Sequence, residues 1–153
     1  MPETGYDSCQ IEKVLEERGE VMTSTSGISM YPMLRHRRDM VTIVKVTRPL
    51  KRHDVPLYRL KSGKLVLHRI LKVTKNGYII RGDNLYHKER NVTDDMIIGV
   101  LKEFYREGKH YDCATSKSYH AYIIYNRLNY PLRWLWKKNL RPFLVKIKHK
   151  IIK

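Results

Sequence analysis

The chain of 153 residues contains few cysteines and no long hydrophobic run. Its two cysteines, Cys9 and Cys113, are far apart in the sequence, which excludes a disulfide framework and does not by itself suggest a zinc site. The longest uninterrupted apolar run, Ala121 to Tyr125, is much shorter than the roughly 20 residues that a membrane-spanning helix needs. We therefore expect no transmembrane helix, no metal and no cofactor.

The first residues, 1–7, lack the apolar segment of a secretory signal peptide. We therefore expect a cytoplasmic protein.

Acidic residues are scarce, and they are unevenly distributed. Lys and Arg number 31 against 15 Asp and Glu, giving a net charge of +16, and residues 118–153 contain nine bases and no acid. Such an excess indicates an anionic partner, either a membrane surface or nucleic acid. Hydrophobic residues make up 42% of the chain, enough for a packed core.

The change in composition suggests three regions. We expect an N-terminal helix over 1–19, a β-domain over 20–108 and a basic, aromatic, amphipathic tail over 109–153. The polar stretch from Glu107 to His110 marks the second boundary.

The hydrophobic pattern predicts mainly β-structure between the two ends. Asp7 or Ser8 is suited to begin the first helix and Gly19 to end it. Short apolar, β-branched segments bounded by turn residues predict strands over 20–26, 40–46, 55–60, 65–73, 77–81 and 96–105. Pro56 predicts an edge strand or a bulge for the third of these. Regularly spaced short strands favour a compact, coiled β-fold over a βαβ sheet.

Three segments contain residues suited to catalysis. Ser29 lies in a Gly-Ile-Ser-Met-Tyr-Pro segment, His68 lies within the apolar segment 65–73, and Asp83 lies in a Gly-Asp-Asn turn. A serine needs a base to attack a carbonyl group, a histidine can be that base, and a carboxylate can orient the imidazole. Each segment alone is also compatible with an ordinary loop, a core histidine or a simple turn.

The order of these segments resembles that of the signal peptidase I and LexA-like serine peptidase superfamily. The resemblance covers roughly residues 20–107 and is nearest to the branch of archaeal and endoplasmic-reticulum-type signal peptidases, in which histidine replaces the lysine base. It implies the complex coiled β-fold of that superfamily, with Ser29 as nucleophile, His68 as general base and Asp83 as orienting acid. It further implies a serine endopeptidase that cleaves a peptide or preprotein.

Some assignments remain open at this point. Glu89, six residues after Asp83, is a second candidate for the acid. Lys64 and Lys72 lie at even spacing from His68 and are candidates for a lysine base. The other function that fits is a catalytically inactive, peptidase-like module that binds a membrane surface or nucleic acid.

The tail resembles an interfacial segment. Pro131 and Pro142 predict three short helices, of which the last has apolar residues at helical spacing between lysines. We expect residues 118–153 to bind an anionic membrane surface from the cytoplasmic side. Packing of the tail on the body is the alternative, and nucleic-acid binding is disfavoured because no recognised motif is present.

Overall fold

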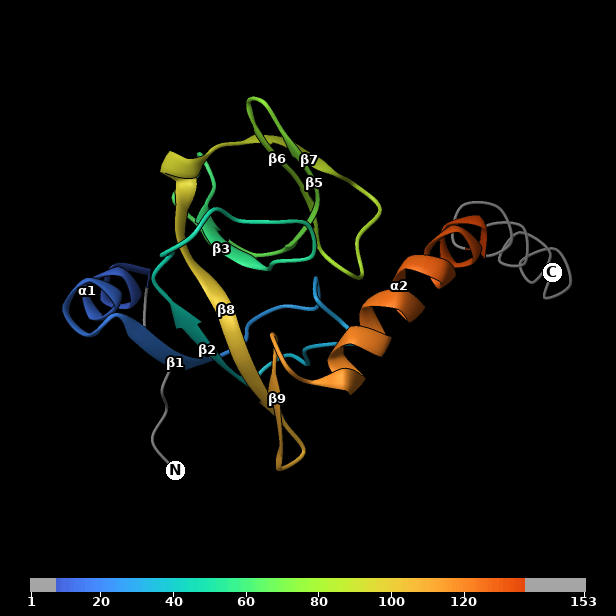
Figure 1. Ribbon diagram of the computed structural model, residues 1–153, viewed down its shortest axis with the longest axis horizontal. Coiled ribbons are helices and arrows are strands. Elements are labelled where there is room, and N and C mark those ends of the chain that lie inside the picture. The colour runs from blue at the N-terminus through green and yellow to red at the C-terminus, as the bar shows by residue number, and fades with distance from the viewer. Residues whose placement is uncertain (1–7, 137–153) are drawn as a thin grey trace, which may run out of the picture. The chain divides into compact units, whose positions relative to one another are not determined.

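The N-terminal helix and the first strand lie where the sequence predicts them. The computed structural model describes residues 8–136, and its first helix, α1, spans Ser8–Arg18 (Figure 1). Gly19 ends the helix, with a positive φ of 78° and a hydrogen bond from its amide to the carbonyl oxygen of Leu15. Leu15 is buried and lies close to Gly99, where any larger side chain would also meet Ile43. The helix therefore packs on the sheet through the face that the sequence pattern indicates.

Within residues 8–136, nine strands form two antiparallel sheets. The larger sheet has the order β1-β2-β8-β3-β4, and β9 also pairs with β8. The smaller sheet has the order β5-β6-β7. The strands of the larger sheet are β1 (Glu20–Ser24), β2 (Met40–Val44), β3 (Pro56–Arg59), β4 (Leu65–Leu67), β8 (Ile97–Arg106) and β9 (Lys109–Asp112). Those of the smaller sheet are β5 (Arg69–Thr74), β6 (Gly77–Arg81) and β7 (Glu89–Val92), and a 3-10 helix, η1 (Asp94–Met96), follows β7.

The long strand β8 is central to the larger sheet. Its first half pairs with β3 and its second half with β2, each with a register shift that bends the sheet (Figure 1). The chain is thus mainly β with a curled sheet, as predicted. The bulge predicted at Pro56 is present between Leu57 and Tyr58, but β3 is an interior strand because it also pairs with β4.

The strand predicted over 65–73 is divided between the two sheets. Strand β4 ends at Leu67 and pairs with β3, whereas β5 begins at Arg69 and pairs with β6. His68 is the residue between them, and its amide donates to the carbonyl oxygen of Pro56. The apolar pattern continues through the break because both sheets bury side chains against the same core.

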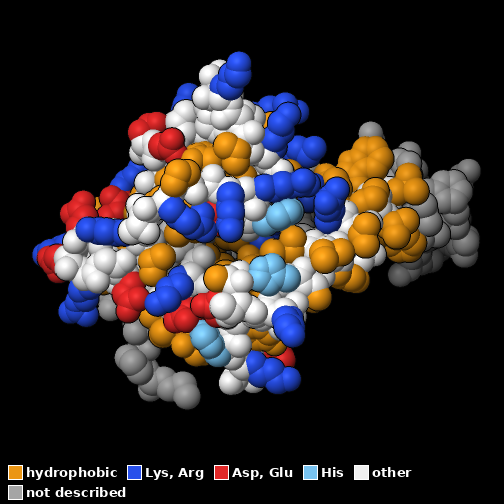
Figure 2. Space-filling model, viewed as in Figure 1, with side chains coloured by type: hydrophobic (Ala, Val, Ile, Leu, Met, Phe, Trp, Pro, Cys, Tyr) orange, Lys and Arg blue, Asp and Glu red, His pale blue; other side chains and the backbone are white. Residues whose placement is uncertain are grey.

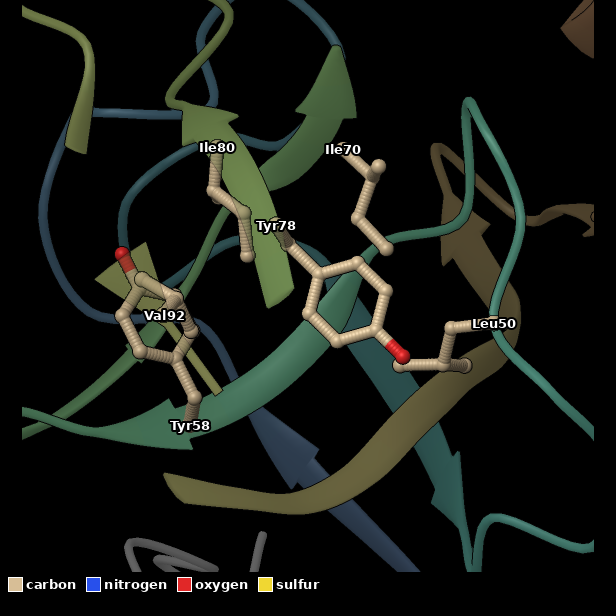
Figure 3. Close-up of a cluster of buried hydrophobic side chains, with 6 residues drawn as sticks. All are labelled: Leu50, Tyr58, Ile70, Tyr78, Ile80 and Val92. Atoms are coloured by element: carbon tan, nitrogen blue, oxygen red, sulfur yellow. The ribbon is translucent and has the colours of Figure 1, made fainter. Parts of the chain in front are cut away.

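That core joins the two sheets. A cluster of buried residues combines Leu50 and Tyr58 with four residues of the smaller sheet, Ile70, Tyr78, Ile80 and Val92 (Figure 3). Burial of each such side chain contributes about 1.5–3 kcal/mol to stability. The hydroxyl groups of Tyr58 and Tyr78 point in opposite directions within the cluster (Figure 3). The hydroxyl of Tyr58 therefore points away from the centre of the cluster, toward the residues described in the next section (Figure 3).

The boundary predicted after residue 108 lies inside a hairpin. Strand β9 pairs with β8, and Glu107 and Gly108 form the turn between them, with φ values of 52° and 74°. The polar stretch that suggested a domain boundary is thus a hairpin turn. The chain divides instead into compact units of residues 1–119 and 120–153.

The C-terminal helix α2 spans Lys117–Leu135. It continues through Pro131, so the prediction of a helix break there is wrong. The third predicted helix, over 143–152, lies outside the described residues. Neither described helix combines the length and hydrophobicity that a membrane span would require.

Candidate active site

The Ser29 loop is fixed by buried residues on its C-terminal side. Met30, Met33 and Leu34 are each at most 5% exposed, and the amide of Leu34 donates to the carbonyl oxygen of Met30. The peptide bond between Tyr31 and Pro32 is cis. Ser29 itself is half-buried, between an exposed Ile28 and an exposed Tyr31. The loop thus holds its serine at the surface while its following residues are anchored in the core.

His68 is buried, and its Nδ1 atom contacts two side chains. Nδ1 lies 3.0 Å from Oε1 of Glu89 and 3.0 Å from the hydroxyl of Tyr58. The Tyr58 hydroxyl donates to the other carboxylate oxygen, Oε2, at 2.6 Å. Strands β3 and β7, from different sheets, therefore hold the imidazole between them.

These contacts determine which nitrogen of His68 can act as a base. A carboxylate oxygen can only accept a hydrogen bond, so Nδ1 carries the proton and donates to Glu89. The other nitrogen, Nε2, then has a free lone pair in the neutral ring. Burial lowers the pKa of His68 below its usual value of 6.5, and this effect outweighs the opposite effect of Glu89. The imidazole is accordingly neutral, and able to accept a proton, at neutral pH.

Gly82 brings the imidazole and the serine loop to one point. A Cβ atom at this position would lie 3.1 Å from Nε2 of His68 and 2.6 Å from the carbonyl oxygen of Ser29. The first contact would be tight and the second too short to persist, so glycine is the residue that lets both groups approach the turn after β6 without a shift of the Ser29 backbone. The edge of the His68 ring that carries Nε2 and the Ser29 carbonyl oxygen therefore both lie beside Gly82.

The turn after β6 also binds the Ser29 loop directly. The amide of Asn84 donates to the carbonyl oxygen of Ser29 at 2.8 Å, and its side-chain amide donates to that of Ile28 at 3.1 Å. These bonds fix the backbone of the serine relative to the turn. They hold the Gly-Asp-Asn segment next to the serine in space, although Gly82 lies 53 positions after Ser29 in the sequence.

Asp83 makes a different contact from the one expected. Its carboxylate accepts two hydrogen bonds from the guanidinium group of Arg69, at 2.8 and 2.9 Å, and both side chains are at most 3% exposed. Arg69 also donates to the hydroxyl of Tyr119, at the start of α2, and to the carbonyl oxygen of His53. Asp83 raises the pKa of His68 less than Glu89 does, because only Glu89 is hydrogen-bonded to the imidazole. The acid in hydrogen-bond contact with the imidazole is thus Glu89.

The structure brings the predicted serine and histidine to the same turn, but it records no hydrogen bond between their side chains within residues 8–136. Catalytic hydrogen bonds are often long in free enzymes and tighten when substrate binds. The candidate lysines are placed differently: Lys64 and Lys72 are both exposed, whereas His68 is buried. The even-spacing argument for them fails because the strand is broken at His68.

Sequence reasoning missed two members of the site. Tyr58 gave no signal beyond its place in an apolar strand, and the role of Arg69 as the partner of Asp83 could be found only from the fold. Glu89 had one sequence signal, its position six residues after Asp83. Comparison of the sequence with known family models and with curated proteins finds no match.

Proposed function

We propose that the chain is a serine endopeptidase that resembles signal peptidase and cleaves a peptide or preprotein. The observation that carries the proposal is the placement of His68, with Nδ1 held by Glu89 and Nε2 directed at the turn that binds the Ser29 loop. This is the arrangement that a serine nucleophile requires of its base.

The proposed reaction proceeds in two steps. The Ser29 oxygen attacks the substrate carbonyl carbon while Nε2 of His68 takes the hydroxyl proton. The C–N bond then breaks, and the imidazolium gives that proton to the leaving amine. Water, deprotonated by the same nitrogen, hydrolyses the acyl-enzyme and restores Ser29.

Three other groups have supporting roles. Glu89 keeps the imidazole in the reactive tautomer and stabilises its positive charge in the transition state. The backbone amide of Ser29 is the donor we assign to the developing oxyanion, since no serine or amide side chain stands at position 27. Asp83, which we expected from the sequence to be the orienting acid, instead holds the turn in place through Arg69.

From the resemblance to signal peptidase, we propose as substrate an extended peptide with small residues at the bond cleaved. The exposed side chains of Ile28 and Tyr31, 65% and 51% exposed, flank Ser29 and offer apolar contacts on either side of the scissile bond. The attack requires the Ser29 hydroxyl to come within hydrogen-bond range of Nε2.

Covalent labelling tests the proposal without a known substrate. A fluorophosphonate probe should modify Ser29 in the wild type, as read by mass spectrometry of peptides. Ser29→Ala and His68→Ala should each abolish labelling, and the double variant should be no worse than either, because residues that act as one unit are non-additive. Ser26→Ala, an exposed serine three positions away, is the matched control and should retain labelling. Labelling elsewhere, or equal labelling of Ser29→Ala, would remove this serine from the mechanism.

The alternative is a catalytically inactive module of the same fold that binds a membrane surface or nucleic acid. It is favoured by the missing Ser29–His68 hydrogen bond and by the net charge of +16. The probe experiment separates the two functions, since an inactive module would leave Ser29 unmodified in folded protein.

A further inference from the structure

Exposed apolar side chains are concentrated on helix α2. Ile124, Tyr125, Leu128, Leu132 and Leu135 are between 45% and 68% exposed. At 3.6 residues per turn, all five fall within an arc of about 100° on the helix surface. We call this arc the α2 apolar face. Figure 2 shows hydrophobic side chains covering much of the visible surface of this helix.

The α2 apolar face is bordered by positive charge. On the helical projection, Arg127 lies on one side of the arc and Arg133 on the other. Residues 118–153 contain nine bases and no acid, and the helix leads into this basic sequence. Trp134 and Trp136, 39% and 51% exposed, add the aromatic side chains that concentrate at lipid–water boundaries.

The apolar side chains and the flanking bases together indicate which kind of partner binds the α2 apolar face. A second copy of the chain would cover the apolar side chains, but it would bring two strongly basic segments together. Nucleic acid would satisfy the charge but would leave a row of leucine and isoleucine side chains without apolar contacts. An anionic lipid surface supplies phosphate groups for the bases and acyl chains for the apolar side chains.

We propose that the α2 apolar face docks on an anionic lipid surface, with the helix lying in the plane of the interface. The proposal is independent of peptidase activity, because it concerns only the helix and its flanking charge. Binding should require anionic lipid and weaken as salt is added. A salt-resistant part should remain, because insertion of apolar side chains does not depend on ionic strength in the same way.

Vesicle co-sedimentation of the full chain tests the proposal. The wild type should bind vesicles of phosphatidylcholine mixed with phosphatidylglycerol, and bind vesicles of phosphatidylcholine alone at least about tenfold more weakly. The double variant Leu128→Ser/Leu132→Ser should lose at least about tenfold in affinity for the mixed vesicles. The matched control, Val46→Ser/Val73→Ser, changes two exposed valines outside α2, 39% and 46% exposed, and should bind as the wild type does.

Several outcomes would overturn the proposal. Equal binding of the serine double variant, or equal binding to both kinds of vesicle, would exclude docking through the α2 apolar face. Absence of vesicle binding would also exclude this docking. In that case, ultracentrifugation would show whether the face instead forms a dimer that Leu128→Ser/Leu132→Ser disrupts, and an RNA-binding assay would show whether the chain binds RNA. Circular dichroism of each variant verifies that the fold is retained, and Leu128→Gln/Leu132→Gln, which keeps good helix formers, replaces the serine variant if the helix is lost.

Discussion

Nδ1 of His68 lies 3.0 Å from Oε1 of Glu89, although the two residues belong to segments of different character and are 21 positions apart. The histidine lies where the chain passes from one sheet to the other, and the glutamate begins β7. Glu89 is thus the carboxylate that orients the imidazole, whereas Asp83 supports the nearby turn through Arg69. The sequence alone could not assign these two roles.

Replacing Glu89 should reduce catalysis while leaving the fold intact. Glu89→Gln removes the carboxylate that fixes the imidazole tautomer, and we expect the rate of probe labelling at Ser29 to fall by about 10²- to 10⁴-fold. Glu89 is half-buried and solvent can reach it, so the melting temperature should change little. The measurement is the labelling rate beside a thermal melt. A variant that labels as fast as the wild type would exclude Glu89 as the orienting acid.

Replacing Asp83 should instead lower the stability of the fold more than it lowers the rate of probe labelling. Asp83→Asn leaves the fully buried charge of Arg69 without its counter-ion, which costs about 3–5 kcal/mol of unfolding free energy. Denaturant titration measures this loss. Glu17→Gln, which breaks an exposed ion pair with Lys13, is the control and should cost less than about 1 kcal/mol. If Asp83→Asn proves as stable as the control and inactive, Asp83 acts in the chemistry after all.

The pH dependence of labelling should report the environment of His68. Because burial lowers its pKa, the acid limb of the profile should have its midpoint below pH 6.5. In Glu89→Gln the midpoint should move to still lower pH, since the lost carboxylate favours the charged imidazolium. A midpoint above 6.5 in the wild type would contradict the assignment of His68 as the base.

The lowered pKa of His68 also makes the stability of the fold depend on pH. Between pH 6.5 and the lower pKa of folded His68, the unfolded chain binds a proton that the folded chain does not. The contribution of His68 to the unfolding free energy therefore falls as the pH decreases through this window, and it is constant above pH 6.5. His68→Gln should remove this part of the pH dependence.

A single methyl group at Gly82 should separate the base from the nucleophile. In Gly82→Ala the new Cβ atom would lie 2.6 Å from the Ser29 carbonyl oxygen and 3.1 Å from Nε2, so one of the two must move. We expect a loss of labelling of at least about 100-fold, because small displacements at a reacting centre have effects of this size. Gly63→Ala, in a turn with no neighbouring atoms within 4 Å, should retain labelling despite its positive φ. Equal labelling of both variants would show that the Gly82 contact is not needed.

The position of a C-terminal truncation should decide whether the body is stable. Tyr119 is 4% exposed and accepts a hydrogen bond from Arg69, so it belongs structurally to the β-domain. A chain that ends after residue 122 should unfold at nearly the wild-type temperature. A chain that ends after residue 117 should be less stable by several kcal/mol, since an aromatic side chain leaves the core and a buried cation loses a partner. Equal melting temperatures would show that Tyr119 contributes little.

The sequence predicts the elements of this fold better than it predicts their connections. The alternation of apolar residues locates the strands, because one face of each strand is buried wherever it pairs. It cannot reveal the break at His68, since Leu67 and Ile70 are apolar on both sides of it. The sequence also could not show whether Glu89 or Asp83 is the acid that contacts the imidazole. That depends on the fold, which places Glu89 beside His68 and pairs Asp83 with the buried Arg69.

The tail illustrates a different limit. Its composition predicts an amphipathic basic segment, and α2 presents an apolar face of that kind. A proline inside a helix removes a backbone hydrogen bond and its ring clashes with the preceding turn, which suggests a break at Pro131, but the helix continues past it. The sequence also could not show that Glu107 and Gly108 form a hairpin turn, because turn residues and linker residues have similar composition.

The passage of the chain between two sheets at His68 links the proposed peptidase activity to a partial opening of the protein. The imidazole is held by Tyr58 from the larger sheet and by Glu89 from the smaller one, and it remains oriented only while the two sheets are docked. A fluctuation that lifts the small sheet by a few ångströms would separate Glu89 from His68 while most of the secondary structure persisted. Heat inactivation should then precede global melting, and a ligand that bridges the two sheets would protect activity more than it raises the melting temperature.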